Sequence, residues 1–151
     1  HRTPLNPNTY TPPGRKTIMA LAISTVLNLP FDEAVARTRA ALADQGFGIL
    51  TEINVKDTLK TKIDADMENY LILGACNPPL AHRALEINRQ IGLLLPCNVV
   101  VRSTGERRTV VEAVDPDMMV GVTDNEQLQD VAADARTRLD TALASLPSRV
   151  S

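Results

Sequence analysis

The sequence predicts an α+β domain whose sheet is rich in antiparallel pairs and whose helices pack on one face. Three observations carry this prediction. Five segments are apolar, or alternate between apolar and polar residues, which is typical of strands. Three segments repeat apolar residues at the spacing of one helix face. The two kinds of segment follow one another in the order β-α-β-β-α-β-β-α. Its first six elements match the ferredoxin-like split β-α-β pattern, which a last strand and a long helix extend.

The expected strands differ in their apolar pattern. They are residues 19–29, 47–55, 70–76, 97–103 and 109–114. The second alternates, so its inward-facing residues should be Phe47, Ile49, Ile53 and Val55. The third is a near-continuous apolar run, which indicates burial on both faces. The last two are expected to form a hairpin around Thr104-Gly105-Glu106.

Three helices are expected, at residues 31–45, from Pro78 to near Asn88, and from Asp124 to Leu146. The stripe of the first consists of Phe31, Ala34, Val35, Thr38 and Leu42. Gly46 is the natural residue to end that helix. For the last helix, Asp124 should be the N-cap, with Gln127 at the third position. Residues 56–66 are polar with isolated apolar side chains, which leaves room for a short helix.

Residues 18–147 are expected to form a single domain. A chain of 151 residues fits one domain plus a tail and can build a core without disulfides or a metal ion. Residues 1–17 carry prolines among polar residues, so we expect a disordered tail or an added remnant there. Residues 148–151 would be a C-terminal tail.

Charge and hydropathy limit the classes of partner. The formal net charge is −2 and both signs are scattered, so the chain lacks the basic face typical of nucleic-acid binding. No segment reaches the ~18–20 apolar residues that cross a bilayer. We therefore expect neither a nucleic acid nor a membrane as partner. We do expect a homodimer, because an open sheet has two edges and the apolar run Val99–Val101 would suit one of them.

The expected location is the cytoplasm, with export as the alternative. Arg15-Lys16 and the apolar run at residues 18–29 resemble the basic and apolar parts of a secretory signal. The run continues directly into Pro30-Phe31-Asp32-Glu33 without a small-residue cleavage pattern. We therefore interpret it as a buried strand.

Cys76 is the strongest candidate for chemistry because a helix start follows it. Asn77 is a good N-cap and Pro78 is favoured at the first helical position. A cysteine at such a position can become a reactive thiolate, and His82, about one turn later, could act as its base. The alternative is that Cys76 is a small buried apolar residue and His82 faces solvent above Glu86.

Cys97 follows Pro96 at the start of an expected strand. In a split β-α-β unit, Cys76 and Cys97 would lie at opposite ends of the sheet, ~17–20 Å apart. A disulfide needs Cα atoms within ~7 Å, so we expect neither a disulfide nor a shared metal site. Structural zinc would also lack ligands, because His82 is the only other usable one. Asn77, Pro96 and Cys97 are the candidates for binding a ligand.

No cofactor is expected. The chain has no glycine-rich phosphate loop and no dinucleotide fingerprint, and Pro78 and Pro79 remove donors that a helix start would offer an anion. Asp64-Ala65-Asp66 and Asp115-Pro116-Asp117 are acidic turns that do not extend into a calcium loop.

Four segments carry a resemblance to a known family. They are Phe31-Asp32-Glu33, Gln45-Gly46-Phe47-Gly48-Ile49-Leu50, Ala75-Cys76-Asn77-Pro78-Pro79 and Leu93-Leu94-Leu95-Pro96-Cys97-Asn98. From about Thr25 to Leu146, the chain resembles the bacterial and archaeal family catalogued as domain of unknown function 302 (DUF302). The resemblance implies an α+β fold and brings no assigned activity.

Three functions stay open on the sequence. The first is a non-catalytic binding or sensing module that depends on its thiols, takes a small-molecule ligand and works as a homodimer. The second is an enzyme that uses Cys76 with His82 as base, and the third is a purely structural assembly module. A cavity of ~300 Å³ or more beside Cys76, the usual lower end for ligand sites, would favour the first.

Overall fold

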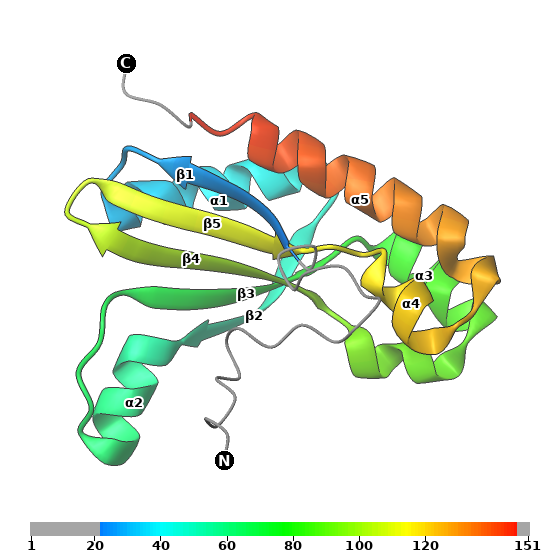
Figure 1. Cartoon of the computed structure of the whole chain (residues 1–151), viewed down its shortest axis with the longest axis horizontal. Helices are drawn as coiled ribbons and strands as arrows, with labels where there is room; N and C mark the ends of the chain where they lie inside the picture. Colours follow the sequence, from blue (N-terminus) through cyan, green and yellow to red (C-terminus); the bar gives the residue numbers. More distant parts are fainter. Residues whose placement is uncertain (1–21, 148–151) are drawn as a thin grey trace, which may run out of the picture.

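Five strands form one antiparallel sheet in the computed structural model, which describes residues 22–147 (Figure 1). The strands are β1 (Ala22–Leu27), β2 (Gly48–Asn54), β3 (Tyr70–Cys76), β4 (Cys97–Gly105) and β5 (Arg108–Val114). Their order across the sheet is β1-β5-β4-β3-β2. The predicted α+β class is confirmed. The strand order departs from a split β-α-β unit, because β2 to β5 follow one another as a meander and β1 closes the sheet against β5.

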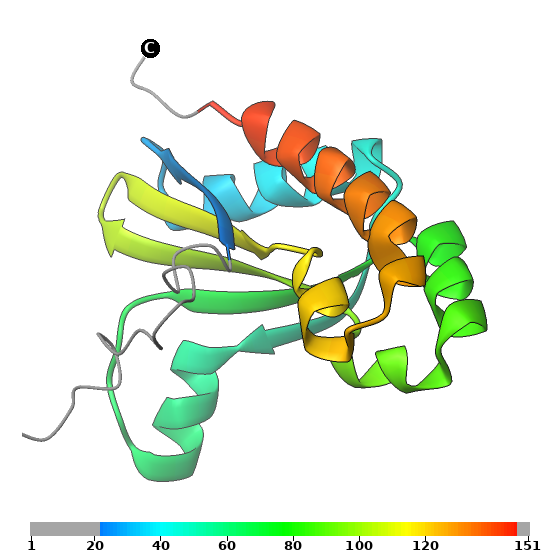
Figure 2. The same cartoon turned by 45° about the vertical axis from the view of Figure 1, so that its right-hand side comes forward.

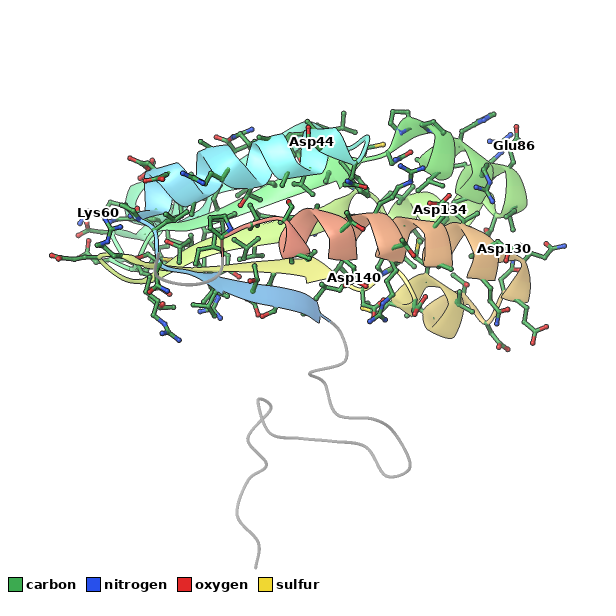
Figure 3. The ribbon with its side chains drawn as sticks, turned by 90° about the horizontal axis from the view of Figure 1, so that it is seen from above. Asp44, Lys60, Glu86, Asp130, Asp134 and Asp140 are labelled. Carbon is green, nitrogen blue, oxygen red and sulfur yellow. The ribbon has the colours of Figure 1, made fainter. Side chains whose placement is uncertain are left out.

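Two long helices, α1 (Phe31–Asp44) and α5 (Gln129–Ala144), lie over one face of the sheet, as the sequence predicts (Figure 3). Their apolar side chains and those of the strands form the main core. Its fully buried members include Leu42, Leu73, Val99, Val111 and Leu139. The shorter α2 (Val55–Ile63) packs against β2 and β3.

Four short elements gather beyond one end of the sheet (Figure 2). They are the helices α3 (Pro78–Ile87) and α4 (Met118–Thr123) and the 3-10 helices η2 (Arg89–Leu94) and η3 (Glu126–Leu128). Together with the first half of α5 they form a second core cluster, built from Leu80, Ala84, Ile91, Met119, Leu128, Val131, Ala132 and Ala135. Helix α5 therefore joins the two clusters, because its second half belongs to the main core.

Strand β2 contains an irregularity that reverses the faces of its last residues. The pairing register with β3 shifts between Ile49 and Thr51. An extra residue in one strand moves every later side chain to the other face. Ile53 consequently lies opposite Ile72, on the face of the sheet away from α1 and α5, and is 48% exposed. The predicted inward positions of Ile53 and Val55 are wrong, since Val55 already begins α2.

The start of α5 also differs from the prediction. Asp124 has a φ of 53° and ends α4 in the left-handed conformation. The side chain of Asn125 accepts a hydrogen bond from the Gln127 amide at 3.0 Å, which begins η3. The predicted N-cap at Asp124 is therefore wrong, and α5 begins only at Gln129.

The edges of the sheet are β1 and β2. Strand β4 lies between β3 and β5, and Val99 and Val101 are fully buried, so the run Val99–Val101 is not an edge. Any pairing between copies must use other residues. Among residues 22–147, no helix has both the length and the apolar character needed to cross a bilayer. The expected tails at 1–17 and 148–151, and Arg15-Lys16, lie outside the described residues.

Candidate functional site

The pairing of β3 with β4 brings the two cysteines to the same end of the sheet. Ala75 and Cys97 are directly opposite in the antiparallel register, and Cys76 is the next residue of β3. Opposite Cα atoms lie ~4.5–5.5 Å apart and consecutive ones 3.8 Å, so the two cysteine Cα atoms are at most about 9 Å apart. The predicted separation of ~17–20 Å is wrong, because adjacent antiparallel strands end and begin at the same edge.

Cys76 and Cys97 line one small cavity between the two core clusters. The cavity has a volume of about 30 Å³ and is walled mainly by Phe47, Ala75, Leu80, Ala84, Met119, Val131 and Ala135. Asn77 and Pro96 also border it, so four of the five sequence-predicted site residues meet here. A space of this size holds one water molecule and is far below the ~300 Å³ of a usual ligand site.

Asn77 fixes the start of α3 beside the cavity. Its Oδ1 accepts a hydrogen bond from the Leu80 amide at 3.3 Å, as expected for an N-cap, and its Nδ2 donates to the Gln45 carbonyl at 3.3 Å. Gly46, with a φ of 84°, makes room for this side chain, because a Cβ there would lie 2.9 Å from the Asn77 Nδ2. Both polar ends of Asn77 are therefore engaged in holding the fold.

Pro96 leads the chain into β4 across a glycine of β3. The Leu95–Pro96 peptide bond is cis, and a Cβ on Gly74 would lie 2.7 Å from the Pro96 Cγ and would also collide with the Thr51 side chain. The absence of a side chain at Gly74 lets Pro96 and Thr51 approach the sheet. This close approach positions Cys97 at the first residue of β4.

Both thiols are free, and they lie in different surroundings. Cys97 is 9% exposed, whereas Cys76 is half-buried. Burial, with a smaller contribution from the neighbouring Cys76, raises the pKa of the Cys97 thiol from 9.0 to about 11. Cys97 therefore stays protonated at neutral pH and is a poor nucleophile there.

The structure places His82 outside this cavity. Its side chain is 73% exposed, and its Nε2 lies 3.2 Å from the Glu86 Oε1 one turn later in α3. It does not border the cavity that Cys76 lines. The described contact of His82 is therefore with Glu86 on the surface of α3.

Met119 is a site residue that sequence reasoning missed. It is 6% exposed and borders the same cavity from α4. With Met118 and Cys97 it also lines a second cavity of about 50 Å³. The sequence signal was weak, because the six-residue α4 is too short to show a periodic pattern.

An ion-pair cluster holds the start of α4 in place. The Asp115 carboxylate, only 7% exposed, accepts a hydrogen bond from Arg136 of α5 at 2.6 Å and another from the Asp117 amide at 2.9 Å. The Asp115 charge raises the pKa of the Arg136 guanidinium. Arg136 also contacts Asp140, which Figure 3 labels on α5. The turn at Asp115-Pro116-Asp117 thus has a structural role, and it positions Met119.

Two apolar clusters joined at a cavity that both cysteine residues border, on a sheet with one helical face, make up a small α+β domain. Residues 23–146 match the family described as Domain of unknown function DUF302, and the chain belongs to that family. The crystal structure of the uncharacterized conserved protein DUF302 from Bacillus stearothermophilus is similar, with 30% identity and a TM-score of 0.75. The match covers 82% of this chain and 96% of that one. No curated protein matches the chain.

Proposed function

We propose that this protein is a non-catalytic binding or sensing module whose response depends on the pair Cys76 and Cys97. The observation that carries the proposal is the β3–β4 register, which brings both cysteines to the same end of the sheet, where both residues border one apolar cavity. Two cysteines that reach the same cavity from neighbouring strands can engage one ligand together. Neither could do so from opposite ends of the sheet.

The surroundings of the thiols favour binding over catalysis. A cysteine nucleophile needs a base or a lowered pKa, and Cys97 has a raised one. His82 contacts Glu86 instead of a thiol. The enzyme alternative therefore lacks support from the arrangement of these residues.

The size of the cavity restricts the ligand. A volume of about 30 Å³ admits one water-sized group, so an organic molecule of usual size would have to displace α3 or α4. The ligand expected here is small and directed at thiols. A reducing compartment such as the cytoplasm would keep both thiols free, and that is the location we propose.

A bridging arsenical tests this function directly. Monomethylarsonous acid reacts with two neighbouring thiols: two As–O bonds break, two As–S bonds form and two water molecules leave. We expect intact-mass spectrometry to find one adduct per folded chain, with both thiols consumed. The adduct should also raise the midpoint of unfolding in urea. Cys76→Ser and Cys97→Ser should each abolish the bridged adduct. His82→Ala should leave the rate of adduct formation unchanged, whereas it would slow the reaction if His82 were the base of a thiol–imidazole pair. An adduct that forms only after unfolding would overturn the proposal.

The module is also proposed to work as a homodimer through the β2 edge. That edge is unpaired within residues 22–147, and it carries Leu50, 66% exposed, beside Ile53. Proteins usually cover an apolar strand edge, and a second copy related by two-fold symmetry is the commonest solution.

A further inference from the structure

The face of the sheet away from α1 and α5 is turned toward the viewer in Figure 1. Leu73 and Val99 belong to the main core, to which both helices also contribute. Successive side chains of a strand point to opposite faces, so their neighbours Ile72 and Val100 point away from that core. We call the surface on which these neighbours lie the open face.

Apolar side chains cross the open face from the β2 edge. Ile53 of β2 lies opposite Ile72 of β3, which lies opposite Val100 of β4. In the next row, Val110 of β5 lies opposite Val26 of β1. The outward face of an antiparallel sheet with helices on one side is usually polar. A row of apolar residues there is typical of a surface that a partner covers.

An ion pair lies among these apolar residues. The Arg102 Nε donates a hydrogen bond to the Glu112 Oε1 at 3.0 Å, and the two side chains are 33% and 32% exposed. Arg102 lies opposite Val110, and Glu112 lies opposite Val100. One cation and one anion side by side make a self-complementary surface. A two-fold axis that passes between them sets each against the opposite charge of a second copy.

The extent of the open face also suits an interface. The sheet has five strands of six to nine residues. Strands ~4.8 Å apart that rise ~3.4 Å per residue give a flat face of roughly 24 Å by 24 Å. With the relief of its side chains, this face is of the order of the ~800 Å² that each partner buries in a stable complex.

We propose that two copies of this protein pack open face against open face, with Arg102 and Glu112 of each copy set against the opposite charges of the other. The inference rests on the homodimer proposed above and names its surface, of which the exposed side chains of Leu50 and Ile53 form the rim. A partner of another sequence would have to supply a matching pair of charges. A second copy always carries that pair.

Light scattering on charge-reversed variants of the full chain tests this surface. Arg102→Glu leaves two negative groups on the open face, and Glu112→Arg leaves two positive ones. Like charges then meet between copies, so each variant alone should have a mass near 16.4 kDa at micromolar concentration. An equimolar mixture of the two variants should regain twice that mass, because opposite charges meet again. Circular dichroism checks that each variant is folded, and recovery on mixing requires contact between copies.

A second variant does not depend on the ion pair. Val100→Lys places a charge without a partner in the middle of the open face and should halve the mass of the dimer. The lysine side chain can reach solvent in the single chain, so the variant should still fold. Val122→Lys is the matched control, because Val122 is 64% exposed but lies in α4, beyond the end of the sheet. Its mass should stay doubled.

A doubled mass in Val100→Lys and in both charge variants would overturn this surface. A mixture that stays at 16.4 kDa while the unaltered chain is doubled would overturn it as well. If Leu50→Lys alone halves the mass, the proposed homodimer stands with the β2 edge as its interface. If the unaltered chain has a mass of 16.4 kDa at every concentration, the homodimer and this surface both fail. The arsenical reaction tests the thiol-dependent function separately from these outcomes.

Discussion

Burial of the Cys97 thiol has a consequence for stability at alkaline pH. Its folded-state pKa of about 11 lies above the ordinary 9.0, so the folded chain keeps a proton that the unfolded chain loses between these values. The free energy of unfolding that this group contributes is fully present below pH 9 and decreases as the pH rises toward 11. We expect the unfolding midpoint in urea to fall more steeply over this window in the unaltered chain than in Cys97→Ala.

Cys76→Ala serves as the control for that comparison, because it removes the half-buried thiol and keeps the buried one. Its midpoint should fall with a slope close to that of the unaltered chain. Parallel slopes for Cys97→Ala and the unaltered chain would show that Cys97 is not buried as described.

Thr38 is a second residue whose surroundings allow a prediction. It is fully buried in α1, and its hydroxyl is without a hydrogen-bond partner among the described residues. An unsatisfied buried polar group costs ~1–3 kcal/mol, and valine has the same branched shape without the hydroxyl. Thr38→Val should raise the free energy of unfolding by about 1 kcal/mol in urea titrations. Thr137→Val, at an exposed position of α5, should change it little, and a loss on Thr38→Val would contradict the burial of that hydroxyl.

At the residue scale, the sequence predicted what depends on local rules. The Asn77 cap and Gly46 at the end of α1 follow from the chemistry of helix ends, and both are found in the structure. The proximity of Cys76, Cys97 and Met119 depends on strand register and on a turn held by a distant arginine. Such contacts have no signal in the residues nearby, which is why the site was predicted only in part.

Gly46 shows how an element depends on one residue at its end. It combines a φ of 84° with the close approach of Asn77, and a non-glycine residue in the left-handed region costs ~1–2 kcal/mol. Gly46→Ala should lower the free energy of unfolding by at least that amount, measured by urea titration followed by circular dichroism. Gly48→Ala, two residues later, is the matched control, because an added Cβ meets nothing within 4 Å. A similar loss in both variants would refute the role given to Gly46.

At the element scale, segments with strong periodicity were predicted well, whereas the strand register was not. Helix α1 was predicted to within one residue, and α2 appeared where the sequence left room for it. The bulge in β2 was missed because the alternation over residues 47–55 predicts inward positions only for a regular strand. Nothing in that pattern shows that one extra residue is inserted between Ile49 and Thr51. Asp124 was misassigned because an aspartate suits an N-cap and tolerates the left-handed conformation equally well.

At the scale of the whole molecule, the proposed homodimer can be checked by light scattering. The unaltered chain should have twice its mass of 16.4 kDa at micromolar concentration. Leu50→Lys places a charge on the β2 edge and should halve that mass. Leu93→Lys is the control, because Leu93 is 85% exposed but lies in η2, away from the sheet edge. A constant mass of 16.4 kDa for all three chains would contradict pairing through this edge.

The predicted class held at this scale because it follows from the number and order of strands and helices. The strand order was not predicted correctly, because the element order is compatible with both a split unit and a meander. The choice between them depends on which strands pair, and that depends on packing between residues far apart in the sequence.

The position of β1 has a consequence for how the chain folds and opens. Strands β2 to β5 are each joined to the next along the chain, whereas β1 pairs only with β5, and the Thr109 hydroxyl reaches the Leu29 carbonyl across 80 residues. Closing so long a loop costs chain entropy before the contacts that stabilise it can form. We expect β1 to join the sheet last and to detach first, so that in native-state hydrogen exchange its amides become labelled before those shared by β3 and β4. The strand that completes the sheet is then also the one through which unfolding begins.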